Sequence, residues 1–284
     1  MMFTITEKQF LAPTVARFVI KAPFIAPKRK PGNFVMLRVS KRGERIPITL
    51  VDSNVQNGTI TLIVQGIGKT TKELLTKEVG DALPDVVGPL GNPTPILQNT
   101  TVACIGGGVG TAELFPITRA LQQSGCNVYS IIGGRTKELV ILEDEMRAYS
   151  IQTYITTDDG SYGRKGIVTD QLKDLLNGRL GIEAVYAIGP MPMMKAVSNV
   201  TKQYGIKTYV SLNAIMVDGT GMCGGCRVTV AGTMKFACVD GPEFDGHEVD
   251  FDEMMMRSRS FRESEVMSLQ RFEHDHACRK EMVQ

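Results

Sequence analysis

The sequence predicts an antiparallel β-barrel followed by a Rossmann-like parallel-sheet α/β domain, a small cysteine-rich lobe and a C-terminal helical tail. Three observations favour this order. Residues 1–98 hold short β-branched runs between turn residues, residues 99–212 alternate strand-like runs with helical spacing, and residues 213–250 concentrate glycine and cysteine. Evenly spaced short strands are typical of a barrel, and β–α alternation is typical of a doubly wound sheet. Residues 251–284 are charged and have helical spacing.

The composition fits a globular chain without a polyanion-binding face. A length of 284 residues suits two domains with an appendage, and 43% of the residues are hydrophobic. The formal net charge of +2 argues against nucleic acid as a partner. No run approaches the roughly 18 apolar residues of a membrane span, and the N-terminus lacks the pattern of a signal peptide. Three of the six cysteines lie between residues 223 and 238, unlike a secreted disulfide scaffold, so we expect a cytoplasmic protein.

The barrel is predicted from runs that alternate polar with apolar residues or are rich in β-branched ones. These runs are residues 3–10, 14–23, 33–39 and 59–65. Residues 28–32 and the Asn57-Gly58 pair read as turns between them.

The parallel sheet is predicted from apolar runs that end in glycine, acidic or turn residues. The predicted strands are residues 101–108, 127–135, 152–160, 183–190 and 207–213. The predicted helices between them are residues 112–125, 138–149, 169–177 and 191–204.

A glycine-rich turn follows the first of these strands. Gly106, Gly107, Gly108 and Gly110 allow the backbone to approach a pyrophosphate, and the helix that follows would offer free N–H groups. Thr111 takes the place of the last glycine of the G-x-G-x-x-G pattern. A plain strand-to-helix turn is the alternative, but the position at the start of the βα alternation favours a nucleotide site.

Two later strand ends fall at the same edge of the predicted sheet. Gly189, Pro190 and Met191 end one strand, and Asp158 and Asp159 end another, where carboxylates are suited to ribose hydroxyls. Acidic strand ends are also common in ordinary loops.

This pattern does not decide whether the nucleotide is NAD or NADP. Arg135 and Lys137 follow the second strand, where they would contact a 2′-phosphate or solvent.

The most specific pattern is Asp218-x4-Cys223-x2-Cys226 with Cys238 eleven residues further on. Plant-type [2Fe–2S] clusters use C-x4-C-x2-C and a distant fourth cysteine, so the spacing is kept while aspartate stands in the first ligand position. The glycines around these residues permit a tight loop that directs N–H groups toward sulfide. A Cys3Asp zinc site and a structural cysteine cluster are the alternatives.

The barrel and the nucleotide motifs together resemble the ferredoxin–NADP reductase superfamily. Residues 45–49 resemble its flavin motif, residues 66–71 resemble its pyrophosphate-cradling Gly-x-Gly-Thr segment, and residues 88–91 match the turn that closes its barrel. The resemblance implies an FAD-binding barrel, an NAD(H) domain, Thr49 near flavin N5 and Arg45 at the FAD pyrophosphate, without side-chain acid–base catalysis. The implied FAD contacts are Arg45, Pro47, Ile48, Thr49, Ile63, Val64, Gln65, Gly68, Lys69, Thr70 and Thr71.

The cluster segment is similar to that of the electron-transfer subunits of bacterial dihydroorotate dehydrogenase, which have cysteine at the first position. Asp218 and residues 241–247 fit better the small-subunit family of NADH-dependent reduced ferredoxin:NADP oxidoreductases, also known as sulfide dehydrogenase subunits. That resemblance implies electron bifurcation with a larger flavoprotein subunit that carries FAD and [4Fe–4S] clusters, and through it with ferredoxin. We expect the carboxylate of Asp218 to tune the potential of the cluster.

Two other functions stay open at this point. One is an electron-transfer subunit for dihydroorotate oxidation, and the other is a non-enzymatic, zinc-stabilised nucleotide-binding module. His274, His276 and Cys278 are predicted to belong to a solvated or partner-facing helix rather than to a metal site.

Overall fold

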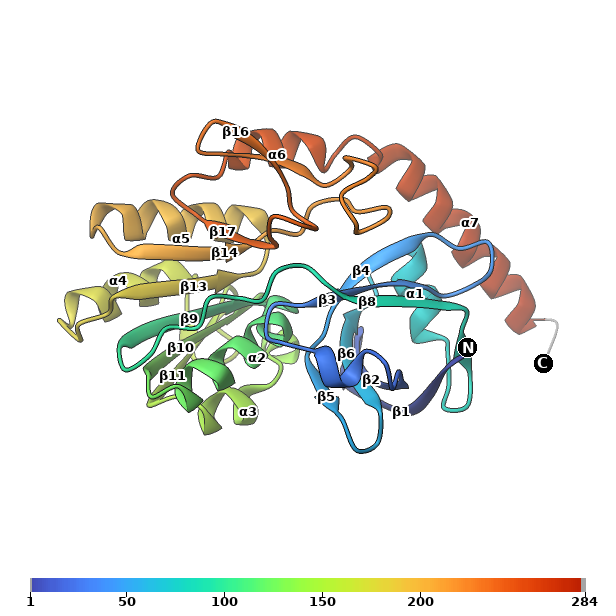
Figure 1. The fold of residues 1–284 in the computed structure, drawn as a ribbon, viewed down its shortest axis with the longest axis horizontal. Coiled ribbons are helices and arrows are strands. Elements are labelled where there is room, and N and C mark those ends of the chain that lie inside the picture. Colours follow the sequence, from blue (N-terminus) through green and yellow to red (C-terminus); the bar gives the residue numbers. More distant parts are fainter. Residues whose placement is uncertain (1, 282–284) are drawn as a thin grey trace.

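The computed structural model describes residues 2–281, with side chains through residue 274. A barrel and a parallel-sheet domain lie next to each other, and a smaller lobe extends over both (Figure 1). The side chains of His276 and Cys278 are outside the described residues. No helix of the described part is long and apolar enough to cross a membrane.

The barrel consists of two antiparallel sheets. Its strands are β1 (Phe3–Ala12), β2 (Val15–Lys21), β3 (Phe34–Arg38), β4 (Arg45–Thr49), β5 (Asp52–Asn54), β6 (Thr59–Gln65), β7 (Ala82–Leu83) and β8 (Asp85–Leu90). The strand orders are β5-β6-β2-β1-β7 and β4-β3-β8. Phe18, Ile20 and Leu62 are fully buried between the sheets, because alternate residues of a strand face the same side.

The second domain is built on one mixed sheet. Its strands are β9 (Thr101–Gly107), β10 (Asn127–Gly134), β11 (Gln152–Thr157), β12 (Arg164–Lys165), β13 (Ala184–Ile188), β14 (Lys207–Ser211) and β17 (Glu243–Asp245). They are ordered β12-β11-β10-β9-β13-β14-β17, and only β17 runs antiparallel to its neighbour. The chain therefore builds outward from β9 in both directions, which places the switch point between β9 and β13.

Four helices cover the two faces of this sheet. They are α2 (Gly110–Gln123), α3 (Glu143–Ala148), α4 (Val168–Asn177) and α5 (Met191–Gln203). Val102 and Cys104 of β9 pack in the core with α2 and α3, whereas Ala103 and Ile105 pack in the core with α4 and α5. A strand that is buried on both faces reads as a continuous apolar run, which explains the signal in the sequence.

The lobe and the tail follow the parallel sheet. Their elements are β15 (Arg227–Val230), β16 (Thr233–Phe236), α6 (Phe251–Arg257) and α7 (Arg262–Glu281). Phe34 and Met36 of the barrel share a small core with Met216, Cys226 and Cys238 of the lobe. The lobe is thus packed on the barrel.

The predicted fold class is confirmed, but two local predictions need correction. The helix predicted over residues 138–149 is split: a 3-10 turn, η2 (Lys137–Leu139), precedes α3. Leu142 lies between them in the left-handed region at φ 58°, and it packs in the core with Ile141. Burial of these apolar side chains therefore overrides helical propensity.

The second correction concerns the turn predicted at residues 88–91, and two further elements carried no prediction. Residues 66–71 lead into one of these, the helix α1 (Lys69–Leu75). Residues 88–90 belong to β8 rather than to a turn, and Leu90 pairs with Phe34. The segment Glu243–Asp245 pairs with β14 and extends the sheet, an arrangement with no local sequence signal.

Candidate functional site

A cavity of about 660 Å³ opens at the carboxyl ends of β9 and β13. This is where the strand order reverses, and open α/β sheets bind their ligands at such a switch point. The turns after β9 and β13 form much of the wall, and Val15 and Gln65 of the barrel complete it. A cavity of this size suits a small organic ligand or cofactor.

The glycine turn after β9 is shaped by close packing on one side and open space on the other. A Cβ on Gly110 would lie 2.5 Å from the Ile188 carbonyl oxygen, so only glycine lets α2 begin against β13. Gly108 has φ 57° and nothing within 4 Å of its Cβ position. Its backbone is therefore open to a ligand in the cavity.

Of the other predicted residues of this turn, one lines the cavity and two pack behind the turn. Gly107 lines the cavity with Gly108 and Gly110. Gly106 does not line it; a Cβ there would lie 2.9 Å from the Cα of the fully buried Thr111. Thr111 thus packs behind the turn.

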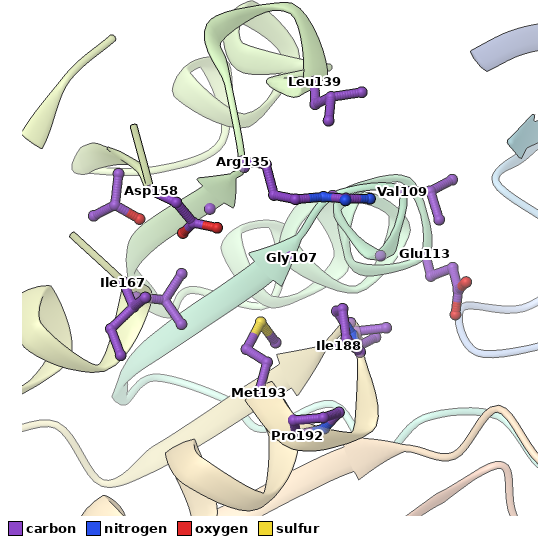
Figure 2. Close-up of a pocket in the computed structure, with 18 of the residues that line it drawn as sticks. Gly107, Val109, Glu113, Arg135, Leu139, Asp158, Ile167, Ile188, Pro192 and Met193 are labelled. Carbon is purple, nitrogen blue, oxygen red and sulfur yellow. The ribbon is translucent and has the colours of Figure 1, made fainter. Parts of the chain in front are cut away.

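The turn after β13 packs directly against the glycine turn, and both turns line the cavity. Gly189 and Pro190 line it, whereas the half-buried Met191 starts α5 and is not part of the wall. Figure 2 shows the sulfur of Met193 turned into the cavity from this side.

The two carboxylates after β11 have different environments. Asp158 lines the cavity (Figure 2). The carboxylate of Asp159 instead accepts hydrogen bonds of 2.9 Å and 2.7 Å from the N–H and the hydroxyl of Ser161. These bonds lower the pKa of Asp159 and hold its side chain within its own loop. Asp158 is therefore the better placed of the two for a ribose.

The two basic residues after β10 are also separated by the structure. Arg135 lines the cavity, and its side chain extends across it toward Val109 (Figure 2). The ammonium of Lys137 lies 5.2 Å from the ring centre of Tyr162. Only Arg135 of this pair is directed at a ligand in the cavity.

The predicted flavin motif forms strand β4. Arg45 is exposed, and its Nε and one terminal nitrogen lie 2.9 Å and 2.7 Å from one carboxylate oxygen of Asp85. Pro47, Ile48 and Thr49 are half-buried in the same strand. Thr49 ends β4, and its interaction with Glu113 of α2 lowers the pKa of that carboxyl.

The remaining predicted FAD residues lie on β6 and around the start of α1. They are Ile63, Val64, Gln65, Gly68, Lys69, Thr70 and Thr71. Ile63 and Val64 are buried in the cores, so their contribution to a cofactor site is limited to the backbone, whereas Gln65 reaches the cavity. Gly68 has nothing within 4 Å of its Cβ position. The Thr71 hydroxyl accepts hydrogen bonds from the N–H groups of residues 67 and 68, which fixes this open segment.

Glu113 is the cavity residue that the sequence analysis missed. It lies in the first turn of α2 and lines the cavity on the side of the barrel, whose ribbon is blue in Figure 2. Burial raises the pKa of its carboxyl to about 7, and the hydrogen bond from Thr49 opposes this shift only in part. Acidic residues are common at helix N-termini, so its position in the sequence carried no functional signal.

The loop at the start of the lobe is organised by Asp218. Its carboxylate accepts hydrogen bonds of 3.0–3.1 Å from the N–H groups of Thr220, Met222 and Cys223, and the first of these contributes most to lowering its pKa. Gly219 and Gly221 have φ values of 75° and 83°, which allow the tight loop around the carboxylate.

The four predicted metal ligands form two pairs. The sulfur of Cys223 lies 3.4 Å from a carboxylate oxygen of Asp218, and the sulfurs of Cys226 and Cys238 are 3.1 Å apart. The first pair is at the surface and the second is buried. Among the described residues, no three His, Cys, Asp or Glu side chains converge on a position that would hold a single metal ion.

Comparison with known sequences and structures bears on this geometry. Residues 213–250 match the family model of the iron–sulfur cluster binding domain of dihydroorotate dehydrogenase B, and residues 104–199 match that of the oxidoreductase NAD-binding domain. The chain is 47% identical to the "dihydroorotate dehydrogenase B (NAD(+)), electron transfer subunit homolog" of Thermotoga maritima, over 94% of each chain. It is 34% identical to the electron transfer subunit of Geobacillus thermodenitrificans, over 87% of this chain and 96% of the other.

The chain belongs to the dihydroorotate dehydrogenase B electron-transfer subunit family. It also superimposes, with a TM-score of 0.90 and 45% identity, on a chain in a structure of the NADH-dependent reduced ferredoxin–NADP oxidoreductase, described for flavin-based electron bifurcation. That match covers 96% of this chain and 98% of the other. Both resemblances predicted from the sequence are thereby confirmed.

Membership of this electron-transfer subunit family makes the chain an NAD(P)H-dependent oxidoreductase subunit. The ferredoxin reductase of carbazole 1,9a-dioxygenase, with 21% identity and a TM-score of 0.62, shares the fold. The predicted cofactor classes, FAD, NAD(H) and an iron–sulfur cluster, are confirmed for this family member.

Proposed function

We propose that this chain is the small subunit of a cytoplasmic, electron-bifurcating, NADH-dependent ferredoxin:NADP oxidoreductase. It would exchange a hydride with NAD(H) at FAD and single electrons with a larger flavoprotein subunit through a [2Fe–2S] cluster. The observation that carries this proposal is the pairing of Asp218 with Cys223 and of Cys226 with Cys238. A two-iron cluster needs two ligands on each iron, and the chain supplies two pairs.

The same pairing argues against the zinc alternative. A structural zinc site needs four ligands around one ion, at roughly 2.0–2.3 Å from it. Among the residues that the structure describes, no such convergence of three or more ligands occurs. The carboxylate of Asp218 is held by three N–H groups beside Cys223.

The barrel residues fit FAD. Gly68 leaves open space at the start of α1, and Thr71 holds the backbone around it, so a pyrophosphate can approach the N–H groups there. Arg45, although paired with Asp85, keeps 44% of its side chain exposed and remains able to neutralise a phosphate. Thr49 would lie beside flavin N5, where its hydroxyl can donate or accept a hydrogen bond.

The cavity residues fit NAD(H). Gly107, Gly108 and Gly110 would receive the pyrophosphate, Asp158 would bind ribose hydroxyls, and Gly189 with Pro190 would border the nicotinamide. A flavin exchanges hydrides with nicotinamide and passes single electrons to iron–sulfur centres, which is the chemistry that the bound cofactors supply. The protein aligns the two ligands and keeps water away from the exchange.

The partner would be a larger flavoprotein subunit with its own FAD and [4Fe–4S] clusters, which in turn would react with ferredoxin. Cys223 of the cluster loop is exposed, and Met222 beside it is 88% exposed. An electron donor or acceptor can therefore approach the cluster loop from outside.

A second candidate function is electron transfer from dihydroorotate oxidation, because the curated relatives that the chain matches are named for that enzyme. The two candidates differ in their products. Orotate formation by the complex with its natural partner would support the second candidate, and NADPH-dependent reduction of NAD+ together with ferredoxin would support the first.

The first experiment is an ultraviolet–visible spectrum of the anaerobically purified chain before and after NADH is added. We expect flavin bands and broad iron–sulfur absorption that bleach with NADH, together with two iron and two sulfide per chain. A colourless protein with stoichiometric zinc would overturn the proposal. Flavin absorption without iron would support the FAD-dependent reductase part of the proposal and contradict the assignment of an iron–sulfur cluster.

A further inference from the structure

Two arginines donate hydrogen bonds to the dipeptide Gly224-Gly225, which separates two of the proposed cluster ligands. Nη1 of Arg227 lies 3.0 Å from the Gly224 carbonyl oxygen, and Nη2 of Arg257 lies 3.4 Å from the Gly225 carbonyl oxygen. Neither arginine was singled out from the sequence. The nucleotide site does not account for them either, because neither side chain lines the cavity.

The contact of Arg227 belongs to a peptide group that also donates to sulfur. The Gly224 carbonyl and the Gly225 N–H are the two ends of one peptide group, and the Gly225 nitrogen lies 3.4 Å from Sγ of Cys223. The guanidinium binds one end of this group, and the sulfur binds the other. Hydrogen bonds in series polarise one another, so a cation at the carbonyl strengthens donation by the N–H. Arg227 therefore acts on the sulfur without touching it.

The orientation of this peptide group is fixed by the backbone on both sides of it. Gly224 has φ 67°, a left-handed conformation that glycine adopts without strain. The Gly224 carbonyl oxygen also accepts a hydrogen bond of 3.4 Å from the N–H of Arg227. Arg227 begins β15 and pairs there with Phe236 of β16. Both donors to this oxygen are thus held by a β-hairpin.

Arg257 reaches the same loop from a different element. It is half-buried in the last turn of α6, the helix beside β16 in Figure 1. Phe251 and Met254 of α6 are buried in one core with Val228 of β15, so the helix is anchored on the hairpin. The Gly225 carbonyl is therefore held by a helix, and the Gly224 carbonyl by a strand.

The two guanidinium groups bring positive charge that no carboxylate neutralises by contact. Among the residues that the structure describes, neither Arg227 nor Arg257 forms an ion pair. Asp218 of the same loop accepts hydrogen bonds from backbone N–H groups instead. Reduction adds negative charge to an iron–sulfur cluster, so nearby positive charge and N–H donation to sulfur both favour the reduced form.

We propose that Arg227 and Arg257 are positioning residues that raise the reduction potential of the [2Fe–2S] cluster, by orienting and polarising the Gly224-Gly225 backbone toward Cys223. The inference rests on the proposed function, because it requires that cluster on the ligands of this loop. The role of the two arginines is confined to the potential, and neither exchanges a proton or an electron. They make the cluster easier to reduce.

The test measures the midpoint potential of the cluster by redox titration followed by electron paramagnetic resonance. It compares the anaerobically purified wild type with Arg227→Gln, Arg257→Gln and the double variant, since glutamine removes the charge and keeps a polar side chain. At a fixed potential, each single substitution should lower the ratio of reduced to oxidised cluster by about threefold, because water partly screens both charges. The double variant should lower it by about tenfold, which is about 59 mV for a one-electron centre.

Arg259→Gln is the matched control for these variants. It removes the same charge two residues after Arg257, but Arg259 is exposed and is hydrogen-bonded to neither glycine. Its ratio of reduced to oxidised cluster should stay within about 1.5-fold of the wild type, because water and salt screen an exposed charge. Arg227→Lys and Arg257→Lys should lie between wild type and glutamine, since lysine keeps the charge but not the planar fork.

The outcomes separate this inference from a structural role and from the proposed function. A merely structural role would lower the iron content and leave the potential of the assembled cluster unchanged, so equal potentials in all three glutamine variants overturn the inference alone. A chain without an iron–sulfur cluster overturns the proposed function, and this inference with it. If Arg257→Gln assembles no cluster, Arg227→Gln decides, because Arg227 is exposed: its potential must lie below that of Arg259→Gln.

Discussion

Neighbouring residues of the same type have different tasks in this protein because their hydrogen-bond partners differ. Asp158 faces the cavity, whereas Asp159 is held by Ser161. Gly108 is open toward a ligand, whereas Gly110 is closed against the backbone of β13. The chemical role of each residue therefore follows from its immediate contacts, and single substitutions test it.

The first prediction concerns Gly110→Ala. Its Cβ would lie 2.5 Å from the Ile188 carbonyl oxygen and 2.8 Å from the backbone of Gly189, and backbone cannot move aside as a flexible side chain can. We expect a loss of about 1–3 kcal/mol in the free energy of unfolding and weaker NADH binding. Urea unfolding and fluorescence titration with NADH measure the two effects.

Gly68→Ala is the stability control for this prediction, because Gly68 has no atom within 4 Å of the Cβ position and an ordinary negative φ of −96°. Its free energy of unfolding should stay within about 0.5 kcal/mol of the wild type. Equal losses in both variants would contradict the steric explanation.

The second prediction concerns Asp218→Cys. A thiolate donates more electron density to iron than a carboxylate and cannot accept the three N–H bonds of Asp218 equally well. We expect a lower midpoint potential for the cluster, measured by redox titration followed by electron paramagnetic resonance. An unchanged potential would show that Asp218 does not tune the cluster.

At the scale of elements, the two main domains are joined by a small number of directed contacts. Arg119 of α2 bridges to Asp52 of β5 through two hydrogen bonds and lies 5.3 Å from the ring centre of Phe115. On the other side of the barrel, α7 lies near α1, where Lys72 forms an ion pair with Glu273. The half-buried bridge at Asp52 should matter more than the exposed ion pair, since water screens exposed charges.

The third prediction is a coupling energy between Asp52 and Arg119. A double-mutant cycle with Asp52→Asn and Arg119→Gln should give about 1–2 kcal/mol, because the pair is bidentate and half-buried. The comparison pair is Arg164 and Asp174, whose side chains are 40% and 60% exposed, against 21% and 42% for Arg119 and Asp52. It should give about 0.3–0.5 kcal/mol. A coupling energy between Asp52 and Arg119 no larger than that of the comparison pair would show that this bridge does not stabilise the contact between the domains.

At the scale of the whole molecule, two buried carboxyls between the barrel and the parallel-sheet domain lower the stability of the fold as the pH rises. Glu113 and Glu243 have raised pKa values of about 7 and about 8, so the folded chain binds protons that the unfolded chain has already released. Their contribution to stability is complete below about pH 4.5 and declines as the pH rises through 7 and 8.

The fourth prediction follows from that decline. Between pH 5.5 and 8.5 the wild-type holoprotein should lose about 2 kcal/mol through these two groups, a figure reduced for their partial exposure. Glu243→Gln should lose less over the same range, because glutamine keeps the volume but does not ionise. Urea midpoints at the two pH values measure the effect, and Glu183→Gln, which replaces an exposed carboxyl, should behave as the wild type. Identical pH dependence in wild type and Glu243→Gln would contradict the assignment.

The sequence by itself determined the order of the barrel, the parallel sheet and the cysteine loop, together with the likeness to the electron-transfer subunit family. These depend on short-range patterns, since strand alternation, helical spacing and the Asp218-to-Cys226 spacing are all local. The helix predicted over residues 138–149 was wrong because the burial of Ile141 and Leu142 is a tertiary effect. Only the tertiary structure decided that β17 extends the sheet, that Asp218 stands with Cys223 and Cys226 with Cys238, and that Glu113 meets Thr49. The last of these contacts joins residues 64 positions apart on different domains, and no spacing along a chain encodes such a meeting.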